Sequence, residues 1–159
     1  SDTATVSFGT YSQYDLITVS GSANNNGTYT VKSVSSDNDY IIVEEEVTTE
    51  TADGSTIVTL DNTGFASAKS QGDGYYSQPD GVHTVSYKVN ATLTGSIKMQ
   101  GTLATTPTED DWFDIAGTTF TTDQSTTISS ANFTGNYVWV RAKATGITAG
   151  TITEILLNK

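Results

Sequence analysis

The chain has no cysteine, only two prolines and a single histidine among its 159 residues. Without cysteine, no disulfide can cross-link the fold, and zinc sites built from thiolates are excluded. The one histidine, His83, cannot supply a metal site that needs several imidazoles, and its local spacing does not suggest a serine–histidine–aspartate triad. We therefore expect no enzyme activity, and we expect His83 to be a strand residue that is half-buried or at the surface.

Positive charge is also scarce, because seven Lys and Arg stand against 18 Asp and Glu and leave a net charge of −11. Residues 1–64 carry −9 of this charge, with Lys32 as their one base, and residues 65–159 carry the remaining −2. Proteins that bind nucleic acids or anionic membranes do so through clustered Lys and Arg. The sequence therefore predicts neither a nucleic-acid partner nor a membrane partner.

Long apolar runs are missing as well. Apolar residues make up 35% of the chain, and no run approaches the ~20 residues that are needed to span a bilayer. The first residues do not show the basic and then apolar pattern of a signal peptide. Nothing in the sequence thus predicts a membrane anchor.

No segment repeats its apolar residues with the helical period of 3.6, so we expect helix to be near absent. Apolar and polar residues instead alternate in short runs, which is the period of a β-strand. Asn and Gly fill residues 21–27 between two such runs, and both accept the positive φ of tight hairpin turns. In the first half of the chain we expect strands at residues 4–8, 15–20, 28–34, 40–47 and 56–60.

In the second half, residues 82–103 form one long alternating run in which Gly95 predicts a bulge or a bend. A polar loop should follow at residues 104–111. Shorter strands are expected at residues 112–115, 118–122 and 125–133.

Residues 136–158 show the strongest strand pattern, and we expect a hairpin of two strands joined by a loop at residues 146–150. The first of these strands has one face of small apolar residues, which suits a core: Val138, Val140, Ala142 and Ala144. Its other face combines two aromatic residues with two cations: Tyr137, Trp139, Arg141 and Lys143. This second face either covers a neighbouring segment of the chain or is an interface with another protein.

The predicted fold class is all-β, with two small antiparallel β modules. Residues 1–64 would form a barrel-like N-terminal unit, and residues 65–159 would form a β-sandwich or jelly-roll-like C-terminal unit. The alternative is one larger sandwich in which residues 1–60 supply part of one sheet.

Three consecutive acids, Glu109, Asp110 and Asp111, are the first candidates for a Ca²⁺ site, because Ca²⁺ prefers oxygen ligands. They do not match the spacing of an EF-hand loop. The acids at residues 44–46 and the Asp-Gly pairs at Asp73 and Asp80 are further candidates, and turn formation explains the pairs without an ion. We expect no cofactor, with Ca²⁺ as the alternative.

Four large aromatic residues lie on or beside the alternating runs: Tyr75, Tyr76, Trp112 and Trp139. Aromatic rings in such positions most often pack into a core or an interface. Exposed rings can instead stack against sugars. Solvent exposure of these rings therefore discriminates between the two interpretations.

Four short stretches, in this order along the chain, carry a family resemblance: DGVHTV (residues 80–85), IKMQGTLATTPTEDDW (97–112), FTGNYVWVRAK (133–143) and TAGTI (148–152). Together they resemble a β-sandwich module in virion structural proteins of tailed phages, notably marine T4-like ones, over residues 72–158. The run at residues 15–45 looks like another small β module that is common in phage tail, neck and capsid-accessory proteins. The resemblance brings no catalytic residues with it.

The resemblance implies a non-enzymatic structural protein at the surface of a phage particle. Head decoration is the first expected role, followed by a capsid, neck or tail accessory role. Its partners would be other virion proteins and copies of itself, so a homo-oligomer is expected. The alternative function is a module that binds glycans on the host surface through Trp112, Tyr75 and Tyr76.

Overall fold

The structure is a computed structural model that describes residues 7–51, 54–76, 81–121 and 127–159. The fold is all-β and antiparallel, which confirms the fold class predicted from the sequence. The helical elements within these ranges are two 3-10 turns, η1 (Asp73–Tyr76) and η2 (Glu109–Asp111). No helix in the described ranges is long and apolar enough to cross a membrane. The strand predicted at residues 4–8 lies mostly outside the described residues.

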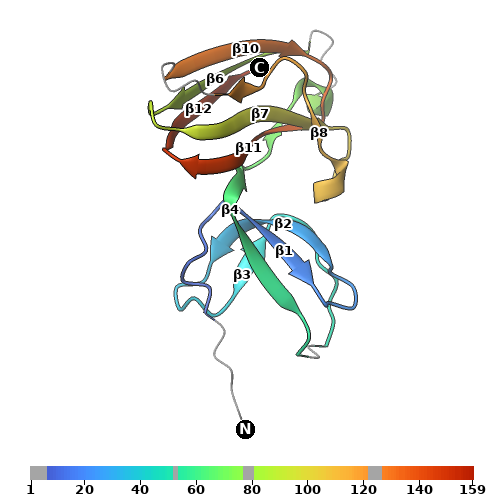
Figure 1. The fold of residues 1–159 in the computed structure, drawn as a ribbon. Coiled ribbons are helices and arrows are strands. Elements are labelled where there is room, and N and C mark those ends of the chain that lie inside the picture. The colour runs from blue at the N-terminus through green and yellow to red at the C-terminus, as the bar shows by residue number, and fades with distance from the viewer. Residues whose placement is uncertain (1–6, 52–53, 77–80, 122–126) are drawn as a thin grey trace.

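Four strands form the N-terminal unit, in the sheet order β3-β2-β1-β4 (Figure 1). They are β1 (Asp15–Ser20), β2 (Gly27–Val34), β3 (Ile41–Val43) and β4 (Ile57–Ala66). The turn between β1 and β2 is closed by the Ser22 backbone N–H, which donates to the side-chain oxygen of Asn26 at 2.9 Å. Leu16, Ile17 and Val31 are the buried apolar residues of β1 to β3, and Ala66 is buried at the far end of β4, so the core of this sheet is thin.

Strand β4 connects the two units (Figure 1). Its residues 57–61 pair with β1, and its last residues, Phe65 and Ala66, pair with β11 (Trp139–Ala149). The register against β1 shifts between Asp61 and Phe65, where the strand bulges. The strand therefore crosses the position between residues 64 and 65 at which the sequence predicted a module boundary.

The C-terminal unit is a sandwich of two sheets. The large sheet continues from β4 through β11 to β7 and β8, and β5 and β9 pair with its members; the small sheet has the order β10-β6-β12. The remaining strands are β5 (Ser70–Gln71), β6 (Val82–Val89), β7 (Thr94–Thr102), β8 (Phe113–Asp114), β9 (Phe120–Thr121), β10 (Ile128–Thr134) and β12 (Ile152–Asn158).

The core lies between these two sheets. Tyr87 of β6, Ile97 of β7 and Val140 of β11 are almost fully buried there. The Tyr87 hydroxyl donates to the Thr118 carbonyl at 2.8 Å, so its one polar group is satisfied. Burying each large apolar side chain contributes about 1.5–3 kcal/mol, which makes this unit the more strongly packed of the two.

The predicted hairpin at residues 136–158 is wrong in its pairing, although both of its strands exist. Strand β11 pairs with β7, β4 and β5, whereas β12 pairs with β6 in the other sheet. The chain crosses between the sheets at Gly150, where φ is +85° and an added Cβ would lie 2.3 Å from the Cα of Leu93. Only glycine fits this crossing.

The long run at residues 82–103 is likewise two strands in different sheets, β6 and β7, and not one bent strand. Its turn is fixed by Asn90, whose side chain accepts the Thr151 N–H and whose own N–H donates to the Thr151 carbonyl, both at 3.0 Å. Apolar and polar residues keep alternating through this corner, because β6 and β7 each bury one face against the same core.

Candidate functional site

The polar face of β11, predicted as an interface, is engaged within the chain. Arg141 is only 4% exposed, and its Nη2 donates to the Glu109 carboxylate of η2 at 2.7 Å. The Lys143 ammonium also donates to Glu109 at 2.7 Å, and Arg141 makes two further bonds to Gln100 at 2.9 and 3.0 Å. We call Gln100, Glu109, Trp112, Arg141 and Lys143 the β11 cluster. Its Arg141 is not available as a surface contact.

Glu109 is the electrostatic centre of the β11 cluster. Burial by itself raises the pKa of this carboxyl group, but the hydrogen bonds and positive charges of Arg141 and Lys143 outweigh burial and hold the pKa below its usual value. Its second oxygen, Oε2, is buried without a hydrogen-bond partner. The ionised carboxylate of Glu109 thus links the η2 turn to β11 through its ion pairs with Arg141 and Lys143.

The two tryptophans are half-buried and make contacts on their rings. The guanidinium of Arg141 lies 4.2 Å from the ring centroid of Trp112. Trp139 is contacted by the ring of Tyr75 at 5.1 Å and by the Lys69 ammonium at 5.3 Å, and its indole N–H donates to the Thr105 carbonyl. These contacts weaken the prediction that Trp112 stacks against sugars.

Tyr75 and Tyr76 are the exposed members of the aromatic set, at 48% and 55%. Their rings pack edge to face at 5.2 Å, and the Tyr76 hydroxyl bonds to the side chain of Gln71. The buried backbone of Gly72 and the buried side chain of Asp73 hold this turn against the sandwich. Of the four aromatic residues singled out in the sequence, only Tyr75 and Tyr76 are exposed; Trp112 and Trp139 are half-buried.

Tyr137, the remaining predicted interface residue, packs across the end of the sandwich. Its ring lies against the backbone of Gly101 on β7, and its hydroxyl donates to the Thr134 carbonyl at 3.1 Å. Phe133 and Phe113 lie at ring-centroid distances of 6.2 and 5.9 Å. The ring of Tyr137 is therefore partly buried by contacts within the chain.

The acids predicted as a Ca²⁺ site have three different roles. Glu109 is tied to Arg141 and Lys143, Asp110 is exposed, and Asp111 accepts the N–H and the hydroxyl of Thr108 at 2.7 and 2.8 Å. The hydrogen bonds from Thr108 lower the pKa of Asp111. Among the described residues, no group of three or more His, Asp or Glu side chains is arranged to hold a metal ion.

His83 is fully buried, which corrects the expectation of a half-buried or surface position. Its ring stacks on Phe133 at 4.8 Å with an interplanar angle of 4°, and its Nδ1 lies 3.0 Å from the Gly81 carbonyl. Buried among aromatic rings, it serves packing in the sandwich.

Glu45 lies where the N-terminal sheet meets the η2 turn. Its carboxylate accepts the Thr30 N–H at 2.9 Å. Burial, with a smaller contribution from the negative charge of Glu109, raises the pKa of Glu45 above its usual value despite that hydrogen bond. The junction therefore brings together two carboxylates whose pKa values are shifted in opposite directions.

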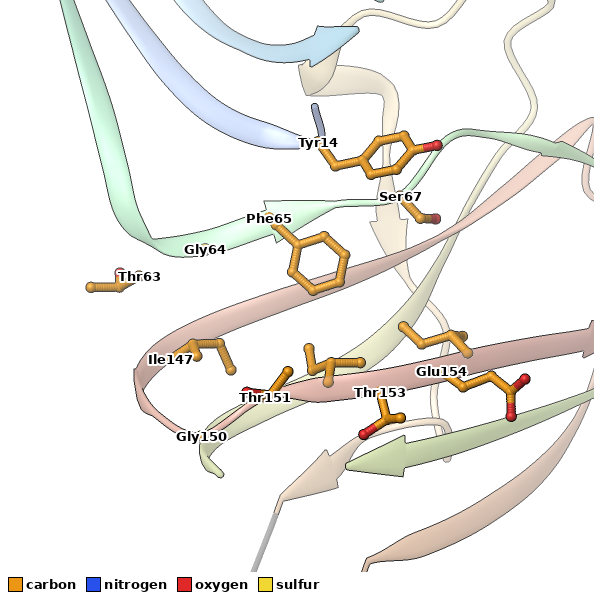
Figure 2. A pocket seen from close by; sticks show the side chains of 12 residues that line it. Tyr14, Thr63, Gly64, Phe65, Ser67, Ile147, Gly150, Thr151, Thr153 and Glu154 are labelled. Carbon is orange, nitrogen blue, oxygen red and sulfur yellow. The ribbon is translucent and has the colours of Figure 1, made fainter. Parts of the chain in front are cut away.

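A groove of about 510 Å³ runs between β12 and the end of β4 (Figure 2). Figure 2 places the rings of Tyr14 and Phe65 on one side and Ile147, Thr153 and Glu154 on the other. An adjoining hollow of about 270 Å³ shares Tyr14, Ser67 and Ile155 with it and reaches the core residues Met99, Val140 and Ala142. We call the two together the β12 groove.

The sequence did not predict the β12 groove. The signal was present in the apolar residues Ile152, Ile155 and Leu157, which all face inward in part. The hairpin interpretation assigned this strand to β11 and not to β6, so the position of its free edge beside β4 was not predicted. The groove follows only from the crossing of the chain between the sheets at Gly150.

The fold and the β12 groove define an all-β, sandwich-like protein with an open apolar edge. Comparison of the chain with protein-family models, with curated proteins and with solved structures found no match.

Proposed function

We propose that this chain is a non-enzymatic structural protein of a tailed-phage particle, most simply a decoration protein of the head or another capsid, neck or tail accessory protein. It acts at the particle surface and associates with other virion proteins and with copies of itself through β surfaces. The resemblance of residues 72–158 to virion β-sandwich modules supports this assignment.

The observation that carries the proposal is the open edge of the sandwich. The β12 groove exposes a route to core residues such as Val140 and Ala142, and its lining is largely apolar. An open apolar edge in a sandwich suits association with another protein. An assembly protein needs no reacting group, only complementary edges and apolar surface.

Immunogold labelling tests the proposal, with antibodies raised against the purified chain and applied to purified phage particles whose genome encodes it. We expect regular labelling on the particle, with the head as the first location, and a mass for the labelled assembly that requires repeated copies. A chain that stays in the lysate and never sediments with particles would refute a virion role.

A second function, binding of host-surface glycans, is favoured by one observation: the exposed pair Tyr75 and Tyr76. Rings of this kind stack on sugar faces. Glycan-array binding that is lost in Tyr75→Ala, and is kept in Ile128→Ala at a distant exposed site, would support this function. No binding to any glycan on the array would remove it.

A further inference from the structure

The wall of the β12 groove that β12 supplies is a strand edge and not a strand face. Residues 152–155 of β12 line it without a break, and so do residues 63–65 of β4. Successive side chains of a strand point to opposite faces, so a groove over one face would be lined by every second residue. Glu154 and Ile155 lie beyond the bulge at Thr153 and still line the groove together, so the groove runs alongside the main chain of β12. Residues 63–65 fall in the bulged part of β4, where regular alternation is interrupted.

This edge of β12 is free to form hydrogen bonds. Among the described residues, β12 pairs with β6 alone and is an outer strand of the small sheet. In an antiparallel strand about half of the N–H and C=O groups point to each side, so the outer side of β12 presents an unpaired row of donors and acceptors. An extended segment can pair with this row, whereas a helix cannot.

The floor of the groove accepts side chains. Ile147, Ile155 and Leu157 are only partly buried and pack against the core. Beneath them the adjoining hollow reaches Met99 and Val140, which are themselves at most 2% exposed. A strand laid along β12 would direct every second side chain into this apolar space and the others to solvent.

Charge indicates the chemistry of the segment. Glu154 lies on the wall of the groove (Figure 2), and Lys88 is its cross-strand neighbour on β6. Within the described parts of the chain the two side chains do not approach closely enough to form an ion pair, so Glu154 has none. A second copy would bring a net charge of −11 to this site, most of it in residues 1–64. A neutral or basic segment from a different polypeptide meets less repulsion than a second copy does.

We infer that the β12 groove is a strand-acceptor site. It takes an extended segment of another polypeptide, with apolar side chains at alternate positions and a Lys or Arg facing Glu154, and this segment completes the small sheet as its fourth strand. The inference rests on the proposed assembly function and specifies the kind of partner that assembly uses.

The inference can be tested by adding a strand to the chain itself, so that no separate peptide has to bind. The full chain is extended after Lys159 by an Asn-Gly turn and a strand of about seven residues that alternates Val with Thr and Lys. Two versions differ only in phase, so that Val falls on odd positions in one and on even positions in the other. A shift of one residue turns every side chain to the opposite face.

We expect only one of the two extended versions to slow amide hydrogen exchange in residues 152–158, by roughly tenfold relative to the unextended chain. The same version should raise Tm by about 3 °C. In that version, replacing the Lys nearest Glu154 by Glu should lessen the gain. Equal effects of the two phases, or no effect of either, would overturn the site.

A second copy as the occupant is tested on the unextended chain. If exchange in residues 152–158 slows as the chain is concentrated, a copy of the chain fills the groove, and the inference of a separate partner is overturned. Failure of the parent proposal looks different: protection by one phase together with absence of the chain from particles would leave the site in place and remove the virion role.

Discussion

Glu109 holds more charged contacts than any other residue of the β11 cluster, and its position was not expected from its sequence context. In the sequence it is one of three consecutive acids in a polar loop. In the fold its side chain is 10% exposed, because the η2 turn places it over Arg141 and Lys143. Local sequence could not distinguish it from Asp110, since the distinction depends on strands more than thirty residues away.

Glu109→Gln should destabilise the chain by roughly 3 kcal/mol, because it leaves the buried Arg141 without its charge partner. The free energy of unfolding from urea titration measures this loss. Asp110→Asn is the matched control in the same turn, and because Asp110 is exposed we expect a change within about 0.5 kcal/mol. Equal effects of the two substitutions would contradict the role given to Glu109.

The stability of the chain should depend on pH through Glu109 in a defined direction. Its pKa is lowered in the folded state, so its contribution is present above the unfolded pKa, near 4.5, and is lost as pH falls through the folded value. Unfolding free energies of the wild type and Glu109→Gln should therefore converge below that range. A gap that is unchanged down to the acid limit would show that ionisation of Glu109 is not the cause.

Glu45 should behave in the opposite way. Its pKa is raised in the folded state, so the fold favours the protonated form, and this stabilisation is lost as pH rises through the folded pKa. Glu45→Gln keeps an acceptor for the Thr30 N–H and removes the charge, so we expect a small gain at pH 7, about 0.5 kcal/mol. The exposed neighbour Glu46→Gln is the control, and a loss of stability in Glu45→Gln alone would refute the assignment.

At the scale of the elements, alternation predicted where strands form far better than how they pair. The strand predicted at residues 15–20 matches β1, and the strands of residues 136–158 are β11 and β12. Period-two alternation reports only that one face is buried. It is the same for a hairpin and for a crossing between two sheets, so the partner of β12 and the groove beside it could not be predicted.

The close contact between Gly101 of β7 and the ring of Tyr137 leads to a prediction about stability. A Cβ at Gly101 would lie 2.5 Å from the ring of Tyr137, which covers this position. Gly101→Ala should therefore displace the ring from the end of the sandwich and destabilise the chain by about 1–3 kcal/mol. Gly9→Ala, whose Cβ would meet only ordinary contacts at 3.6 Å or more, is the control, and thermal unfolding of both variants measures the difference.

At the scale of the whole molecule, two features combine. The sandwich supplies the larger buried core, and β4 joins it to an acidic, thinly packed sheet. The open edge at β12 lies where these two units meet, with Tyr14 and Phe65 from one side and Ile155 from the other. We therefore propose this junction, and not the polar face of β11, as the principal docking site of the chain.

Hydrogen–deuterium exchange of the chain within intact purified particles, compared with the isolated chain at the same pH, tests that placement most directly. We expect the amides of residues 152–158 to exchange markedly more slowly in the particle, while those of Tyr75 and Tyr76 change little. Identical exchange of β12 in both states would contradict it.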